Sequence, residues 1–94
     1  MAIKISEKIR EKLMHKHSVK DDEIQQCFAN RTGGYLVDIR EKHASNPKTQ
    51  WFISETNCGR KLKIAFIQEN GDVYIRTAFE PNETELRIYN KGAY

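Results

Sequence analysis

The stretch "GRKLKIAFIQENGDVYIRTAF", from Gly59 to Phe79, decides the fold. Apolar residues alternate with polar ones on both sides of Asn70-Gly71, which is typical of strands with one buried face. Asn-Gly is the strongest short signal for a β-hairpin, because a type I′ turn needs positive φ at both central residues. The stretch therefore predicts two antiparallel strands, over Lys61–Gln68 and Asp72–Phe79.

The two-residue turn also predicts the register of this hairpin. It pairs Ala65 with Arg76 and Ile67 with Tyr74, and cross-strand partners share a face of the sheet. A basic strand face that carries an aromatic ring suits RNA, but an ordinary solvated sheet has the same composition. Both interpretations stay open at this stage. The expected face holds Lys61, Lys63, Tyr74 and Arg76.

Helices are expected before and after the hairpin. Ser6 is a suitable N-cap for a helix over Glu7–Lys16, in which apolar residues recur four positions apart. Acidic residues favour the start of a second helix near Asp21, and "NRTGG" ends that helix. Asn82, with Glu85 three residues later, predicts a capping box at the start of a third helix.

Three more segments have strand character: Ala2–Ile5, Tyr35–Ile39 (a strand or an irregular extended segment) and Gln50–Thr56. A long polar loop is expected over Arg40–Gln50. This order predicts an α+β fold in which two N-terminal helices pack on a small antiparallel meander, followed by a C-terminal helix. The length of 94 residues suits a single domain over residues 1–94. The helices would cover one face of the sheet and leave the other free for binding.

Charge and cysteine content narrow the class of protein. The net charge of +3 permits a nucleic-acid or acidic-protein partner without requiring one. Cys27 and Cys58 lack the spacing of zinc ligands, so we expect no metal site and no cofactor. No stretch has the length of a membrane span, and the N-terminus lacks the apolar run of a signal peptide. We therefore expect a reduced, cytoplasmic protein without membrane contact.

Two segments resemble a known protein family. "KHSVKDDEI" (Lys16–Ile24) is similar to the lysine-histidine-glycine-valine segment and acidic helix start of BrnT-type toxins, and "GRKLKIAFIQENGDVYIRTAFEPNETELRIY" (Gly59–Tyr89) is similar to their second block. Ser18 stands where the family has glycine, and Phe79 where it has arginine. The resemblance implies a RelE-like fold and a metal-independent endoribonuclease, the toxin of a type II toxin–antitoxin pair. It also implies a cognate antitoxin, often a DNA-binding repressor.

Cleavage of RNA without a metal needs a base, an acid, and cations that hold the charge on the phosphate. Arginine suits the last role, because its planar fork pairs with phosphate oxygens. Histidine can act as a base near neutral pH, and Glu80 directly follows the hairpin. The expected catalytic residues are His17, Arg60, Arg76 and Glu80, and the expected RNA-binding residues are Lys61, Lys63, Tyr74, Arg87 and Tyr89. Four of them, His17, Arg60, Arg87 and Tyr89, also match positions of the family pattern.

Plainer interpretations of these residues stay open. His17 can bond to backbone carbonyls at a helix end, and Tyr89 can be a packing residue. The absence of an arginine at Phe79 favours a non-catalytic module that binds RNA or a protein. A homodimer is a further alternative, in which Ile67 and Tyr74 would be buried across a two-fold axis.

Overall fold

The computed structural model describes residues 1–39 and 47–94 of the chain. Its elements, in chain order, are β1 (Ile3–Lys4), α1 (Glu7–Lys12), the π-helical turn η1 (Leu13–His17), α2 (Asp21–Asn30), β2 (Leu36–Val37), β3 (Thr49–Glu55), β4 (Lys61–Glu69), β5 (Asp72–Phe79) and α3 (Glu83–Gly92). Most of the loop expected over Arg40–Gln50 lies outside the described residues. Its last two residues belong to β3.

The described strands form one five-stranded sheet in the order β1-β5-β4-β3-β2. The expected α+β class is confirmed, but the sheet is mixed rather than antiparallel throughout, because β1 runs parallel to β5. The N-terminus reaches this edge through two hydrogen bonds at the start of β5. The backbone N–H of Val73 donates to the carbonyl of Ala2 (2.9 Å), and the N–H of Ala2 donates to the Asp72 carboxylate (3.0 Å).

The hairpin of β4 and β5 forms as expected at its turn. Asn70 and Gly71 have φ of 54° and 83°, and Ile67 pairs with Tyr74. The predicted pairing of Ala65 with Arg76 is wrong, because Ala65 pairs with Thr77. The register shifts between Ala65 and Phe66, so Arg76 is the extra residue of a β-bulge.

The bulge has a packing reason. Ile75 pairs with Phe66 and Ala78 pairs with Ile64, and all four side chains are buried. Residues three apart on a regular strand point to opposite faces. The extra residue lets both Ile75 and Ala78 reach the same core, which a strict alternation would prevent.

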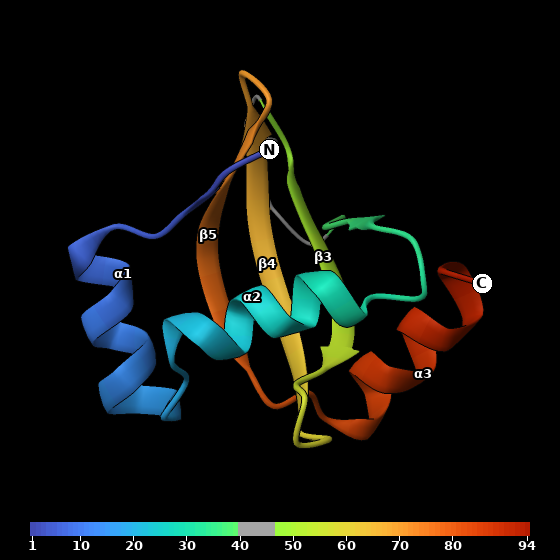
Figure 1. The fold of residues 1–94 in the computed structure, drawn as a ribbon. Coiled ribbons are helices and arrows are strands. Elements are labelled where there is room, and N and C mark those ends of the chain that lie inside the picture. The colour runs from blue at the N-terminus through green and yellow to red at the C-terminus, as the bar shows by residue number, and fades with distance from the viewer. Residues whose placement is uncertain (40–46) are drawn as a thin grey trace.

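One face of the sheet packs under α1, η1 and α2. Figure 1 shows α2 crossing in front of the three long strands, with α1 beside it. Leu62, Ile64 and Phe66 share the face of β4 that these helices cover, and each is 0% exposed. Phe28 of α2 makes edge contacts with the rings of Phe52 and Phe66, at 4.7 and 5.6 Å between centroids. The helical side of this core contains Leu13, Val19, Ile24 and Cys27.

The opposite face is not free at one end, because α3 packs there. The Tyr89 ring lies 5.7 Å from the Trp51 ring. Lys63 of β4 lies beneath α3 and is only 3% exposed. Its Nζ atom lies 2.8 Å from Glu85 Oε2 and 4.5 Å from the centre of the Trp51 ring. The expectation that Lys63 belongs to a solvated face is therefore wrong. The sequence placed Lys63 on the correct face of β4. However, α3 covers this part of the face, and Glu85 of α3 supplies the counter-charge.

The helix starts agree with the local signals. The Ser6 side chain accepts the N–H of Ile9 (3.2 Å). In α3 the capping box is complete, since Glu85 N–H donates to Asn82 Oδ1 (2.8 Å) and Asn82 N–H donates to Glu85 Oε1 (3.0 Å). Across the part of the chain that the structure describes, no helix combines the length and the apolar character that a membrane span requires.

Candidate functional site

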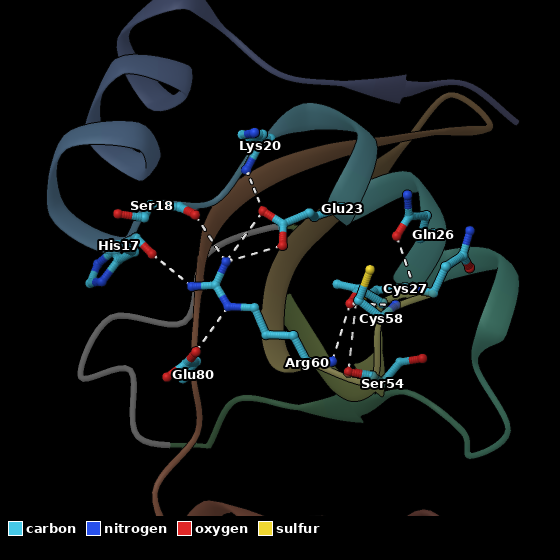
Figure 2. Close-up of polar contacts among 12 residues, drawn as sticks. His17, Ser18, Lys20, Glu23, Gln26, Cys27, Ser54, Cys58, Arg60 and Glu80 are labelled. Atoms are coloured by element: carbon cyan, nitrogen blue, oxygen red, sulfur yellow. Dashed lines mark hydrogen bonds and ion pairs between the residues drawn. The ribbon is translucent and has the colours of Figure 1, made fainter.

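Three of the four residues expected to be catalytic meet at one hollow at the end of the sheet. His17 ends η1, Arg60 directly precedes β4, and Glu80 directly follows β5. All three line a hollow of about 300 Å³, together with Lys16, Ser18 and Phe79. Three chain segments that lie far apart in the sequence therefore converge here, and Figure 2 shows their polar contacts around the guanidinium of Arg60.

The Arg60 guanidinium uses all three of its nitrogens within the protein. Nε donates to Glu80 Oε1 (2.9 Å), and one terminal nitrogen donates to the His17 carbonyl (2.9 Å). The other terminal nitrogen donates to the Ser18 carbonyl (2.9 Å) and to both carboxylate oxygens of Glu23 (3.1 and 3.2 Å). Arg60 thus joins the η1–α2 turn to the ends of β4 and β5 (Figure 2).

These contacts change the acid–base properties of the partners. Hydrogen bonding to Glu80 is the main cause that raises the pKa of Arg60 above its already high ordinary value. Burial alone would raise the pKa of Glu23. The Lys20 backbone N–H and the Arg60 guanidinium outweigh burial, and the pKa of Glu23 is lowered. Arg60, which lines the hollow, is therefore held from behind by an ion pair with Glu23.

The turn that follows η1 aims two carbonyls at Arg60. Ser18 has φ 52° and ψ 41°, a left-handed conformation that glycine adopts more readily than serine. This residue stands where the BrnT pattern has glycine. The His17 ring lies beside Phe79, with 5.6 Å between centroids. The His17 carbonyl accepts a hydrogen bond from Arg60, whereas the imidazole ring of His17 is on the rim of the hollow.

Glu80 and His17 are the groups here that can exchange protons. The Glu80 side chain is 65% exposed, and Arg60 Nε holds one of its oxygens. Within the described residues, no group of three or more histidine, cysteine or acidic residues is arranged to hold a metal ion. An exposed carboxylate and an imidazole therefore line one hollow beside a fixed positive charge, and both kinds of group can serve as a general acid or base.

Arg76 and Tyr74 lie on an exposed part of β5, away from this hollow. Arg76 is exposed and is not among the residues that line the hollow. Its carbonyl accepts Lys12 Nζ at 3.5 Å. Tyr74 is 40% exposed and pairs with Ile67. The structure thus separates Arg76 from the other three expected catalytic residues.

The residues expected on helix α3 have two different environments. Tyr89 is 2% exposed, its hydroxyl donates to the Gly34 carbonyl (2.8 Å), and burial raises the pKa of its phenol. It is a packing residue, so its ring offers no open face to a nucleobase. Arg87 is exposed and lines shallow hollows on the outer side of the helix with Thr84 and Ile88.

A larger groove lies between α3 and the ends of α2 and β3. Its volume is about 610 Å³, and Lys61 is the expected RNA-binding residue that it exposes. Tyr89, another of the expected RNA-binding residues, contributes to the wall of this groove from the core.

Sequence reasoning missed several residues of these two sites. Glu23 was recognised only as an acid in a helix start, although it is the partly buried partner of Arg60. An acid in a first helical turn, inside the segment that resembles the family, is the signal that could have marked it. The groove residues Asn30, Asn57, Asn90 and Tyr94 carry no sequence pattern, because only tertiary packing brings them together.

Comparison with known proteins adds no assignment. No protein-family model matches the sequence, and no curated protein sequence matches it.

Proposed function

We propose that the chain is a metal-independent endoribonuclease with a RelE-like fold, a divergent relative of BrnT-type toxins. The observation that carries this proposal is the meeting of His17, Arg60 and Glu80 at one hollow. They come from the two segments that resemble the family, and nothing in the local sequence requires those segments to meet. The left-handed Ser18, at a family glycine position, adds support.

The proposed reaction needs only groups of this hollow. Glu80 takes the proton from a ribose 2′-OH, and the 2′-oxygen attacks the adjacent phosphorus. The bond from phosphorus to the 5′-oxygen breaks, and His17 gives that oxygen a proton. The products are a 2′,3′-cyclic phosphate and a 5′-hydroxyl end. Arg60 orients Glu80 through the 2.9 Å hydrogen bond, and Lys16 at the rim supplies positive charge for the phosphate.

The biological setting is part of the same proposal. A toxin of this kind acts on RNA in the cytoplasm and is neutralised by a cognate antitoxin protein. Because the hollow is polar and open, an antitoxin has only to cover His17 and Glu80 to block access of RNA. Arg76 and Tyr74, on the exposed part of β5, extend the RNA-binding surface beyond the hollow.

The test is cleavage of a labelled RNA by the purified protein in the presence of EDTA. His17→Ala and Glu80→Gln should each lower the rate by at least about 100-fold, since a general acid or base contributes this much. His15→Ala, on the same turn, and Glu69→Gln, at the far end of β4, are matched controls that should cleave as the parent does. Absence of cleavage by the parent protein, or equal rates in all four variants, would exclude this function.

A second candidate is a non-catalytic module that binds RNA. Two observations favour it: Phe79 replaces the family arginine, and the Arg60 guanidinium already has four internal partner residues. This candidate predicts binding that weakens steeply with salt and no cleavage product. The homodimer alternative, with Ile67 and Tyr74 across a two-fold axis, remains a prediction that sedimentation analysis tests.

A further inference from the structure

We propose that the groove beside α3 is a nucleotide-binding subsite, which holds the part of an RNA strand next to the hollow. This inference rests on the proposed action on RNA, but it concerns separate residues. The groove of about 610 Å³ is within the range of sites that hold small ligands. Its polar lining comes from α2, β3, the β3–β4 turn, β4, α3 and Tyr94.

The groove and the hollow open at the same end of the sheet. β3 ends at Glu55, β4 begins at Lys61, and β5 ends at Phe79. Arg60 lines the hollow and the next residue, Lys61, lines the groove. Adjacent Cα atoms are about 3.8 Å apart, and successive side chains of a strand point to opposite faces. One strand of RNA that crosses this end of the sheet can therefore meet both sites.

The side chains at the mouth of the groove are held in place before any ligand binds. Gln26 Oε1 accepts the backbone N–H of Asn57 (2.9 Å), and Asn30 Nδ2 donates to Asn57 Oδ1 (3.0 Å). The Asn30 amide also donates to the Glu55 carbonyl (2.9 Å). A binding site in which the polar groups are already fixed loses less entropy when the ligand binds.

Tyr94 provides an aromatic surface at the rim. It is 71% exposed, yet its hydroxyl is 2.7 Å from Thr32 Oγ1 and its ring meets the Tyr89 ring edge-on at 5.9 Å and 82°. The ring is thus oriented by its neighbours while part of it stays open. Stacking on such a ring is the general way in which proteins hold an unpaired base.

The charges of the groove suit one phosphate rather than a dense polyanion. Of the described residues that line it, Lys61 is the cation and Glu55 is the carboxylate, and they are cross-strand partners. The remaining polar groups are amides and hydroxyls, including the exposed amide of Asn90. Amides present both a donor and an acceptor, as the edges of nucleobases do. This combination fits a single nucleotide with its base against Tyr94 and its phosphate near Lys61.

The experiment uses a short 2′-O-methyl RNA, which has no 2′-OH nucleophile and cannot be cleaved. Titration of the ¹⁵N-labelled protein should shift the amide signals of Asn57, Lys61, Asn90 and Tyr94. Tyr94→Ala should weaken binding at least about fivefold, the loss expected when one stacked base is released. Tyr94→Phe keeps the ring and should bind like the parent.

Lys61→Ala should also weaken binding, whereas the charge-matched Lys91→Ala, on the outer side of α3, should not. Signal shifts confined to the hollow, or Tyr94→Ala and Lys61→Ala proteins that bind as the parent does, would overturn the subsite. The two proposals can fail separately, because this assay needs no cleavage and the cleavage assay uses His17 and Glu80. Groove binding without cleavage would leave the subsite standing and exclude the ribonuclease.

Discussion

Replacement of Lys63 by methionine tests the buried ion pair beneath α3. The side chains of Lys63 and Glu85 are 4% and 11% exposed, with 2.8 Å between Nζ and Oε2, so solvent screens their attraction very little. Methionine keeps the apolar stem and leaves the Glu85 carboxylate without this partner. Removing one member of a buried ion pair costs about 3–5 kcal/mol. The slight exposure of Glu85 places Lys63→Met near the lower value, about 3 kcal/mol.

The assay is urea unfolding followed by the fluorescence of Trp51, the single tryptophan of the chain. Its ring centre lies 4.5 Å from Lys63 Nζ, so the probe reports on the site itself. A loss of about 3 kcal/mol lowers the urea midpoint by about 1–3 M. Lys61→Met is the matched control, since this lysine is exposed on the same face of β4 and should change the free energy of unfolding by less than about 0.5 kcal/mol.

A double variant separates the lost attraction from a packing defect. In Lys63→Met with Glu85→Gln, the neutral amide needs no counter-charge and still accepts the N–H of Asn82 in the capping box. The double variant should recover at least half of the free energy of unfolding that Lys63→Met loses. The reasoning is refuted if Lys63→Met is as stable as Lys61→Met, or if the double variant is less stable than Lys63→Met alone.

Three other predictions follow from the same contacts. Arg60→Ala removes the hydrogen bonds to Glu23 and to two carbonyls, so it should cost about 2–3 kcal/mol and lower the melting temperature by about 8 °C or more; an unchanged melting temperature would contradict the structural role. Folding lowers the pKa of Glu23 from an ordinary value of 4.5, so its stabilising effect is present above pH 4.5 and is lost as the pH falls through the folded pKa. Glu23→Gln should therefore flatten the decline in the free energy of unfolding as the pH is lowered, and an identical decline in the variant and the parent would count against the ion pair. Burial raises the pKa of the Cys27 thiol to about 12, whereas Cys58 is exposed, so a thiol reagent should label one cysteine in the native protein and two in urea. Rapid labelling of both cysteines in the native protein would show that Cys27 is accessible.

The destabilisation expected for Arg60→Ala also bears on the function. A loss of RNA cleavage in that variant would not separate catalysis from folding, because Arg60 joins the η1–α2 turn to the strand ends. Glu80→Gln and His17→Ala are the sharper variants. Their side chains lie at the rim of the hollow, and the contacts that hold the turn use the backbone carbonyl of His17 rather than its ring.

The features that the sequence predicts well depend on groups only a few residues apart. Asn70-Gly71 predicts the turn because both residues tolerate positive φ, and the structure has both at positive φ. Asn82 and Glu85 predict the start of α3 because one turn of helix brings them within hydrogen-bond distance. The alternation of Leu62, Ile64 and Phe66 predicts a buried strand face for the same local reason.

The candidate site is predicted only in part. The resemblance pointed to His17 and Arg60 together, and the structure brings them to one hollow with Glu80. The resemblance did not indicate that Arg60 is held by Glu23, which lies 37 residues away along the chain. The register predicted from the turn also paired Arg76 with the wrong residue. It could not anticipate the β-bulge, which forms because Ile75 and Ala78 are both buried in the same core.

By itself, then, the sequence determined the turns, the helix starts and the faces of the long strands, because hydrogen bonds and side-chain periodicity act over a few residues. The tertiary structure decided which of these faces stay exposed. Lys63 and Lys61 have the same parity on β4, yet α3 buries the first and leaves the second in the groove. That difference depends on where a helix 20 residues further along packs, since Glu85 meets Lys63 across a sequence separation of 22 residues.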